Sequence, residues 1–530
     1  NEQTFSEGLP DLYRRAGYDA IIMDWNNCFQ HNHYPKEYLY HPQRAGGITV
    51  IWGNSIAFQK FQRYAHGLIS LDDYMGYLDT HMGSGLPRSF PLYCNDAEVF
   101  DFRPGSTAEH AAGEWKRIEA LFENLSLRAD VELVFPSEVI KRASSNSGSM
   151  SFQDIRLASE ETPLPCKKQD RYNPTRWALT GRDTVHLNTL CWRAYNDLKS
   201  LGSSVDEETM GRFRETLCFL WASDFRTNTT DEKLLSFYEA MGWLSTETKR
   251  LLNGRYATVT KRPNPSTGGK TVDETDKMLK IETPAVSIEF LKDRGLAINS
   301  LVMPSLSSMP LIGTLQHGSF EDIHYGADFF SGHLINIRGD GRKVTDLKTT
   351  SARIEAGDDS LEVSAALELE GAMLLKSYRI FKYEPRLDIT YRLKVDGLEA
   401  SSLRLGIFTF MAVGFDRKNL FFETMNGGFY PERYHPCGHT INHDTSVSQI
   451  VSSSSCLGAT GGWVTIGDKD KAIRITTDKS MLFSVPLLHY KDIEDRFFFR
   501  IYHSIGETDE TSYWVWRGFN TISFTIEPDA

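Results

Sequence analysis

The sequence has few cysteines, no long apolar run and no excess of basic residues. Its seven cysteines among 530 residues are scattered and form no Cys-x-x-Cys pair, which is typical of reduced thiols and not of a disulfide scaffold. No apolar segment approaches the roughly 20 residues that cross a bilayer. A net charge of −12 leaves no basic face for a phosphate backbone. We therefore expect a cytoplasmic protein that binds neither membranes nor nucleic acid.

Length and composition indicate a multidomain globular protein. At roughly 100–200 residues per domain, a chain of 530 residues is expected to hold about three domains. Aromatic residues make up 12% of the chain, and aromatic faces serve both as core and as stacking platforms for ligands. The first residue is Asn1 and not Met, so any targeting segment upstream stays outside this expectation.

The first part of the chain, residues 1–105, alternates between helix-like and strand-like segments. Such alternation predicts a parallel sheet or barrel, whose reactive groups lie at the carboxyl ends of the strands. The expected strands cover 20–23, 48–52 and 90–94, and the expected helices cover 9–16 and 71–78.

The periodicity changes twice further along the chain. Residues 106–254 repeat apolar side chains at helical spacing and predict a helical domain. Residues 255–279 are rich in proline and glycine and read as a linker. From 280 to 530 the period becomes two without intervening helices, which predicts a large antiparallel β-sandwich. The expected fold is thus a multidomain combination of α/β, α and β parts.

Carboxylates that follow the predicted strands are the first candidates for chemistry. Asp24 ends the strand over 20–23, and Asp96 and Glu98 follow the strand over 90–94. Glu2, directly before the first helix, joins them if another strand lies upstream.

Two segments resemble glycoside hydrolase family 57. In that family a nucleophilic Glu ends a barrel strand, a helix with an Ala-Gly turn follows, and the next strand ends in Asp. Glu2, then Leu9–Gly17 and Ile21–Asp24, are similar to this pattern and have its spacing. Asn95–Phe100 (Asn-Asp-Ala-Glu-Val-Phe) is similar to the family's Asp-x-Glu-x-Phe segment, whose first Asp is the general acid. A weaker match is Trp221–Phe225, which looks like a late motif near the substrate.

The resemblance implies a fold and an activity. It implies that 1–105 are the C-terminal part of a (β/α)7-type barrel and that the C-terminal sandwich is similar to the mutarotase-like domain of these enzymes and of family 38 α-mannosidases. It also implies a retaining glycosidase or transglycosidase for α-linked saccharides, such as an α-amylase or 4-α-glucanotransferase. Glu2 would be the nucleophile and Asp96 the general acid and base. The chain departs from the family in lacking the opening His-Gln-Pro strand and in having Asp101–Gly105 where many members have Gly-His-Trp.

Further polar and aromatic residues near these motifs are candidates for contacts with a sugar. His31 and His33 are two positions apart, so they would point to opposite sides of a strand, and we expect no metal site. No cofactor is expected. The candidate substrate-binding residues are Asp24, Trp25, His31, His33, Trp52, Asn54, Glu98, Trp177, Arg182, Asp183, Trp221 and Asp224.

Two other functions stay open on the sequence. One is a metal-dependent polysaccharide deacetylase, which would need His and Asp ligands around a metal. The other is a non-catalytic carbohydrate-binding subunit that has kept the fold. The barrel strands that would precede Asn1 leave open a second chain that supplies them, as well as a homo-oligomer.

Overall fold

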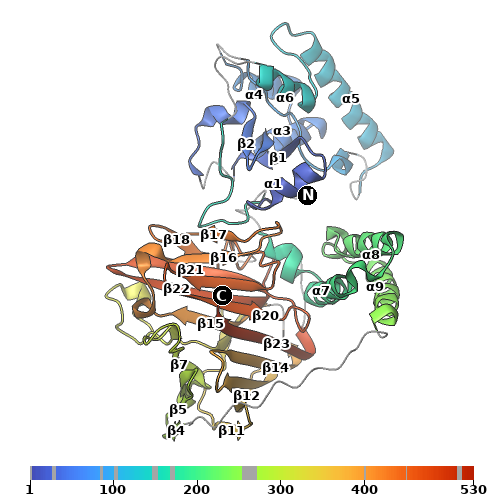
Figure 1. Ribbon diagram of the computed structural model, residues 1–530. Coiled ribbons are helices and arrows are strands. Elements are labelled where there is room, and N and C mark those ends of the chain that lie inside the picture. Colours follow the sequence, from blue (N-terminus) through green and yellow to red (C-terminus); the bar gives the residue numbers. More distant parts are fainter. Residues whose placement is uncertain are drawn as a thin grey trace. The chain divides into compact units, whose positions relative to one another are not determined.

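The computed structural model divides into two compact units. Unit 1 spans Asn1–Gln169 and unit 2 spans Asp170–Ala530 (Figure 1). None of the described helices has the length and apolar character that crossing a bilayer requires. The structure describes residues 3–26, 32–83, 87–100, 105–145, 153–166, 173–252, 271–398, 401–448, 451–509 and 516–529, with the side chains of Glu98 and Leu398 left out.

Unit 1 contains a small sheet with helices around it. The strand order is β1-β3-β2, in which β1 runs parallel to β3 and β2 runs antiparallel to it. The elements are α1 (Leu9–Arg15), β1 (Ala20–Asp24), η1 (Lys36–Tyr40), β2 (Gln43–Ala45), β3 (Ile48–Gly53), α3 (Ser55–Ala65), α4 (Leu71–Asp79), η2 (Ala97–Phe100), α5 (Ala108–Ser126) and α6 (Pro136–Ser145).

Local sequence explains these elements. Ile48, Val50 and Trp52 of β3 are buried, so the strand is held from within the unit. Helix α4 begins at a capping box in which Ser70 and Asp73 satisfy each other's backbone N–H groups. The expected strands at 20–23 and 48–52 and the helices at 9–16 and 71–78 are confirmed to within a residue or two. One parallel strand pair is not yet a barrel, so the (β/α)7-type barrel stays a prediction.

The strand predicted over 90–94 is wrong. These residues have no ladder in the structure. Pro91 lacks the N–H that a strand needs, and Tyr93 is held by side-chain packing instead. Its ring centroid lies 5.2 Å from that of Phe61 and 5.1 Å from that of Phe100. The apolar run is therefore half-buried, with Tyr93 packed against helix α3 and η2, which is an alternative to sheet formation that periodicity cannot reveal.

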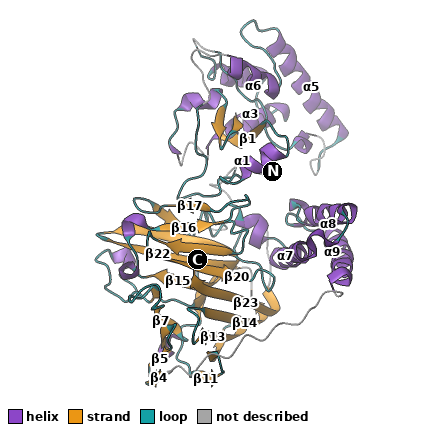
Figure 2. Cartoon of the chain, in the orientation of Figure 1, coloured by secondary structure: helices purple, strands orange, loops and turns teal. Residues whose placement is uncertain are grey.

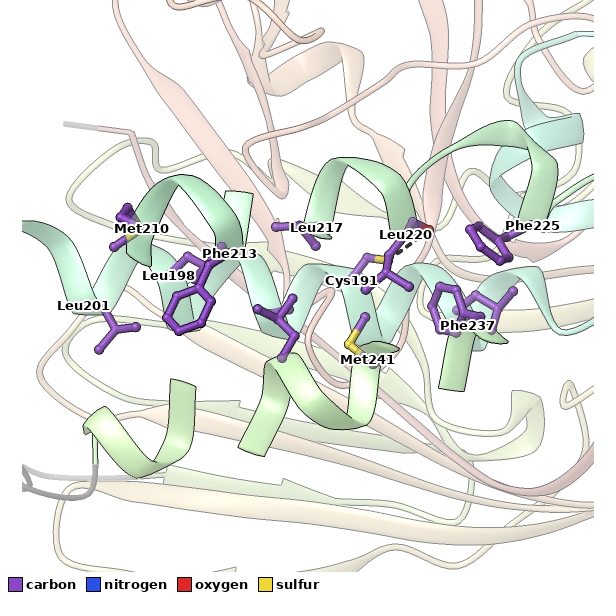
Figure 3. Packing of buried hydrophobic residues seen from close by; sticks show 13 residues of the cluster. Cys191, Leu198, Leu201, Met210, Phe213, Leu217, Leu220, Phe225, Phe237 and Met241 are labelled. Atoms are coloured by element: carbon purple, nitrogen blue, oxygen red, sulfur yellow. Dashed lines mark hydrogen bonds between the residues drawn. The ribbon is translucent and has the colours of Figure 1, made fainter. Parts of the chain in front are cut away.

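The helices of unit 2 pack on one another through an apolar core (Figure 3). Leu187 of α7, Phe213 and Leu220 of α8, and Phe237 and Leu244 of α9 are each at most 2% exposed. The helical spacing of these side chains is the pattern that predicted helices in this region, and helices are present. The elements are η3 (Arg176–Thr180), α7 (Thr184–Leu201), η4 (Gly202–Ser204), α8 (Glu207–Leu220), η5 (Ser223–Phe225) and α9 (Asp231–Leu252).

The division into units differs from the domain limits expected from the sequence. Helices α5 and α6 belong to unit 1, whereas α7, α8 and α9 belong to unit 2. The expected limits, with domains over 1–105, 106–254 and 280–530 and a linker over 255–279, stay a prediction.

The rest of unit 2 consists of two large antiparallel sheets (Figure 2). One has the order β18-β21-β22-β15-β8-β7-β6-β5-β4, with β9 also paired to β15 and β10 paired to β9. The other has the order β11-β12-β13-β14-β23-β20-β19-β16-β17. The predicted antiparallel architecture is confirmed.

The strands of the first sheet are β4 (Thr271–Glu274), β5 (Met278–Glu282), β6 (Ser287–Leu291), β7 (Ala297–Val302), β8 (Ile312–Gly313), β9 (His333–Arg338), β10 (Lys343–Thr345), β15 (Ser401–Phe410), β18 (Thr440–Asn442), β21 (Val485–Ile493) and β22 (Arg496–Gly506). Those of the second are β11 (Arg353–Ala356), β12 (Ser360–Leu369), β13 (Ala372–Phe381), β14 (Leu387–Leu398), β16 (Phe421–Thr424), β17 (Glu432–Tyr434), β19 (Trp463–Gly467), β20 (Ala472–Thr477) and β23 (Trp516–Pro528).

The two sheets face each other across a shared core. Phe408 of β15 and Phe524 of β23 meet edge to face with ring centroids 5.9 Å apart. Lys376 of β13 is fully buried, and its ammonium group lies 2.6 Å from Asp346. A buried ammonium without that carboxylate would be strongly unfavourable. The sheets therefore form a sandwich whose core also encloses a paired charge.

His503 of β22 lies in this core as a neutral ring. Its Nδ1–H donates to the Gly406 carbonyl at 2.9 Å, and its ring centroid lies 4.6 Å from that of Phe524. Its Nε2 is buried and has no hydrogen-bond partner among the described residues. Burial lowers the pKa of His503 to about 4. Protonation would place a charge on a nitrogen that nothing in this part of the core can solvate.

Acid is therefore expected to destabilise unit 2 through His503. Between about pH 4 and 6.5 the unfolded chain binds a proton that the folded chain does not, so the free energy of unfolding falls as the pH falls through this window. The loss is on the order of 3 kcal/mol for a shift of this size. Urea unfolding of the wild type and of His503→Gln at pH 7, 5.5 and 4 measures this loss of stability. The stability gap between the two proteins should narrow at low pH, whereas replacing the exposed His317 by Gln should leave the wild-type pH dependence intact.

Candidate functional site

The carboxyl ends of β1 and β3 lie side by side and bring a buried carboxylate into a polar setting. The strand register pairs Asp24 with Gly53, so both parallel strands end at the same edge. Asp24 is 3% exposed. Its Oδ1 accepts a hydrogen bond from the Asn26 N–H at 2.9 Å, and its Oδ2 accepts one from the Ser55 hydroxyl. These two hydrogen bonds hold the Asp24 carboxyl group in one orientation at this edge.

A third segment, the loop before η2, reaches the same edge through Cys94. Burial, and next the charge of Asp24, raise the pKa of the Cys94 thiol. A methyl group added to Gly53 would lie 3.5 Å from the Cys94 Cβ, which places this side chain against the end of β3. The residues that follow β1, those that follow β3 and the loop that carries Asp96 therefore meet at one place. The absence of a strand over 90–94 does not change this convergence.

Two predicted contact residues are accounted for by packing. Trp25 and Trp52 are 5% and 1% exposed, and their rings meet edge to face with centroids 5.1 Å apart. Both belong to the apolar core around β1 and β3. Asn54 is the N-cap of α3, and its side-chain oxygen accepts from the N–H groups of Ile56 and Ala57. Trp25, Trp52 and Asn54 thus each have a structural role, and the sugar contacts expected of them stay predictions.

The structure describes some of the predicted catalytic and substrate-binding residues of unit 1 and leaves others out. Asp96 is exposed in the loop before η2, and its backbone carbonyl accepts a hydrogen bond from the Tyr93 hydroxyl at 2.6 Å. Glu98 lies in η2, but its side chain is outside the described part of the chain. Glu2 and His31 also lie outside the described residues. His33 is exposed and has a positive φ of 54°, which is uncommon for a residue with a side chain.

Three predicted contact residues belong to the start of the helical part of unit 2. Trp177 lies half-buried in η3, where its carbonyl accepts from the Asn188 side chain at 3.4 Å. Arg182 forms an ion pair with Asp231 of α9 at 2.6 Å. Asp183 has a positive φ of 59° before α7 and accepts a hydrogen bond from the Tyr238 hydroxyl at 2.8 Å. These contacts tie α7 to α9.

The second motif of this region divides into a buried and an exposed part. Trp221 follows α8 and its ring lies 6.2 Å from that of Tyr195. Asp224 is exposed in η5. Arg226 is 4% exposed, and its guanidinium donates to the Asn188 Oδ1 at 2.8 and 3.1 Å and to the Leu220 carbonyl. Arg226 is therefore held as a structural cation, whereas Asp224 is free to meet solvent.

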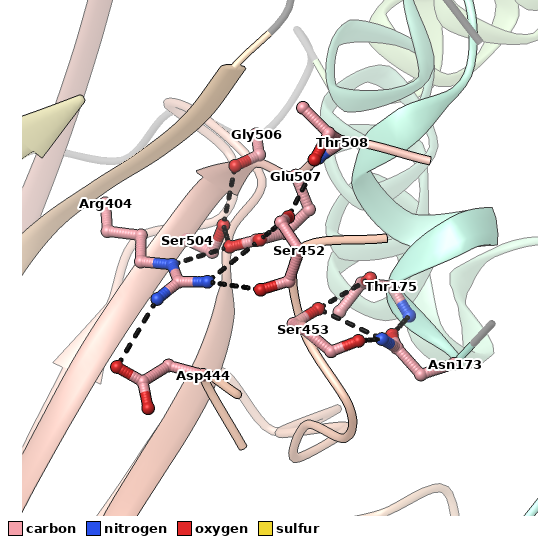
Figure 4. Close-up of polar contacts among 10 residues, drawn as sticks. All are labelled: Asn173, Thr175, Arg404, Asp444, Ser452, Ser453, Ser504, Gly506, Glu507 and Thr508. Carbon is pink, nitrogen blue, oxygen red and sulfur yellow. Dashed lines mark hydrogen bonds and ion pairs between the residues drawn. The ribbon is translucent and has the colours of Figure 1, made fainter. Parts of the chain in front are cut away.

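A buried polar network in the sandwich was not predicted from the sequence (Figure 4). Arg404 of β15 donates to both carboxylate oxygens of Glu507, at 2.8 and 3.0 Å, and the hydroxyls of Ser452 and Ser504 donate to the same carboxylate. Burial opposes charge on Glu507, but Arg404 and then these hydroxyls hold the pKa of Glu507 below its usual range. Asp444, at 3.5 Å from the guanidinium, completes the network. In the sequence, the charged Arg404 between Leu403 and Leu405 was the signal that could have revealed this network.

The network continues into the segment that leads to the helices of unit 2. The side-chain nitrogen of Asn173 donates to the Ser453 carbonyl and to the Ser453 hydroxyl, and Asn173 also accepts from the Thr175 N–H at 2.8 Å. Ser453 follows Ser452 directly, so one loop connects the buried carboxylate to the entry of η3 (Figure 4). The start of the helical part is thereby fixed to the sandwich within unit 2.

Comparisons with known proteins give matches in structure but none in sequence. No protein-family model and no curated protein matches the chain. A glycosyl hydrolase family 38 protein from Enterococcus faecalis matches over 99% of this chain and 71% of its own, at 7% identity and a TM-score of 0.50. The chain has a glycoside hydrolase-like fold. At this identity the likeness concerns the fold alone.

Two further solved structures match the chain with TM-scores below 0.5. The 4-alpha-glucanotransferase from Thermococcus litoralis matches over 99% of this chain and 80% of its own, at 10% identity and a TM-score of 0.33. A galactose mutarotase-like protein from Clostridium acetobutylicum covers 49% of this chain and 98% of its own, at 10% identity and a TM-score of 0.32.

Proposed function

We propose that this chain is a retaining glycoside hydrolase or transglycosidase for α-linked poly- or oligosaccharides. The observation that carries the proposal is the meeting of three segments at the ends of β1 and β3, with the buried, hydrogen-bonded Asp24 among them, in a chain with a glycoside hydrolase-like fold. In this proposal unit 1 includes the C-terminal part of a (β/α)7-type barrel, and the sandwich of unit 2 is mutarotase-like.

The roles follow from the chemistry of a glycosidic bond. Cleavage with retention needs one carboxylate that attacks the anomeric carbon and one carboxylic acid that protonates the leaving oxygen, about 5–5.5 Å apart. We assign attack to Glu2 and proton transfer to Asp96, which later activates water or an acceptor sugar. No described residue forms a hydrogen bond with the Asp96 carboxyl group, so it is available to a substrate oxygen.

Asp24 suits a positioning role better than proton transfer. Both of its oxygens already accept hydrogen bonds, from Asn26 and from Ser55. A carboxylate held in this way keeps its charge and its orientation, as a group that aligns its surroundings must. It also adds negative potential where an oxocarbenium-like state would develop positive charge.

Product analysis tests the proposed function. The full chain is incubated with α-1,4-linked and α-1,6-linked gluco-oligosaccharides and with α-linked manno-oligosaccharides, and with cello-oligosaccharides as the β-linked control. We expect shorter or transferred products from at least one α-linked substrate and none from the control, with the α-anomer appearing first in proton NMR spectra. A first product with β configuration would overturn the retaining mechanism. Absence of products from every α-linked substrate would overturn the function.

A further inference from the structure

Unit 2 contains a hollow of about 390 Å³ between α8 and α9, whose lining includes none of the candidate residues named above. Its volume lies in the range of about 300–1,000 Å³ that small-molecule sites occupy. It is formed by the connection that precedes α8 and by one face of each helix. The residues on which the argument rests are Asp206, Arg212, Phe213, Trp243, Glu247 and Arg250.

The apolar wall of the hollow is an aromatic pair. Trp243 of α9 is 43% exposed although it is the largest side chain in the lining. Its ring meets that of Phe213 at 65° with centroids 5.7 Å apart, and Phe213 is 2% exposed in the helical core. The core therefore holds the indole in place while nearly half of Trp243 stays accessible. An aromatic surface kept rigid and open in this way suits the apolar face of a ring-shaped ligand.

The polar wall combines both signs of charge. Arg250 pairs with Glu247 at 2.9 Å, and Asp206 caps α8 by accepting from the Thr209 N–H at 2.8 Å. The guanidinium of Arg212 has no hydrogen bond or ion pair with any residue that the structure describes. Two arginines and two carboxylates cancel in formal charge, which favours a neutral ligand with many hydroxyl groups over an anion. Arg212 offers several donors to such a ligand in a fixed plane.

We propose that this hollow binds a saccharide of one to three pyranose units, stacked on Trp243 with hydroxyls bonded to Arg212 and Glu247. The choice of ligand rests on the proposed function, which it deepens: the hollow is a second, non-catalytic contact for the same class of polysaccharide. Such a contact raises the local concentration of a long substrate without touching the reacting atoms.

Equilibrium titration of the full chain tests this inference without requiring turnover. The probes are maltotriose, α-linked mannotriose and inorganic phosphate. Their binding is measured by calorimetry and by the change in tryptophan fluorescence. We expect one trisaccharide to bind, and Trp243→Ala to weaken that binding at least about tenfold, which corresponds to about 1.4 kcal/mol. Trp243→Phe, which keeps an aromatic face, should retain most of the affinity. Trp115→Ala is the matched control, since Trp115 is 46% exposed on α5 and outside the hollow.

The outcomes separate this inference from the proposed function. Unchanged affinity of Trp243→Ala, binding of phosphate alone, or no binding of either trisaccharide would overturn it. Loss of affinity in a protein that cleaves no substrate would support the inference and contradict the catalytic proposal. If both hold, Trp243→Ala should raise KM for a long polysaccharide and leave kcat on a short oligosaccharide unchanged. Thermal unfolding of each variant identifies any that fail to fold, and Arg212→Gln then provides the second test, with an expected loss of several-fold in affinity.

Discussion

Replacement of Asp96 by Asn is expected to lower the turnover of α-linked saccharides by about 10²–10⁴-fold, the range that general acid–base catalysis contributes. Asparagine keeps the size of the side chain but cannot give a proton to the leaving oxygen. Substrate binding should persist, because the proposed role of Asp96 lies in the transition state. Single-turnover rates and equilibrium binding of one oligosaccharide, measured on both proteins, separate the two effects.

The turnover of the variant Glu2→Gln should fall at least as far as that of Asp96→Asn, because without the nucleophile no glycosyl-enzyme can form. The matched control for Asp96→Asn is Asp19→Asn. Like Asp96, Asp19 is exposed in unit 1, but it precedes β1 and so lies at the opposite end of that strand from Asp24. Equal losses in Asp96→Asn and Asp19→Asn would show a general effect on folding or charge and would remove the assignment of the acid.

The elements that the sequence predicted well are those in which local pattern and burial agree. β1 and β3 are short apolar runs bounded by Gly17 and Gly53, and the structure buries most of β3 inside unit 1. The run over 90–94 is also short and apolar, but it contains Pro91. The ring of Tyr93 finds partners in α3 and η2, and a sequence pattern does not reveal such partners.

Position after a strand was a useful guide to the site but an incomplete one. It selected Asp24 and Asn54, yet Asp24 also accepts a hydrogen bond from Ser55, one residue past Asn54, and its charge acts on Cys94, in a loop 70 positions away. It also could not separate aromatic residues that face a ligand from those that face the core, as Trp52 shows. Burial is a property of the folded chain, so composition alone leaves this choice open.

Charged residues near helix ends were equally ambiguous in the sequence. Arg182 and Asp183 are adjacent, and both were candidates for contacts with a sugar. In the structure Arg182 pairs with Asp231, and Asp183 accepts a hydrogen bond from Tyr238. Both partners lie on α9, more than 40 positions along the chain. Tertiary contacts of this kind decide between a structural and a functional reading, and they depend on how α7 packs against α9.

The buried pair of Arg404 and Glu507 leads to the largest expected change in stability. Arg404→Met should lower the free energy of unfolding by about 3–5 kcal/mol, because it leaves a buried carboxylate without its cation. Glu507 is fully buried on its side chain, and the hydroxyls of Ser452 and Ser504 alone cannot replace a bidentate guanidinium. Urea unfolding followed by circular dichroism measures the change.

Two comparisons decide whether the buried charge is the cause of that loss. Arg353→Met removes an arginine that is 78% exposed and pairs with Glu355 on the same strand, so it should cost about 1 kcal/mol or less. The double variant Arg404→Met/Glu507→Leu removes both members of the buried pair and should be more stable than Arg404→Met alone, since the remaining charge, on Asp444, is 22% exposed and can meet water. If Arg404→Met were no less stable than Arg353→Met, the network would be solvated in solution. The loop from Ser452 to Ser453 would then hold the entry of η3 only through the contacts of Ser453 with Asn173 and Thr175. That entry should exchange its amide hydrogens faster than the core of α7.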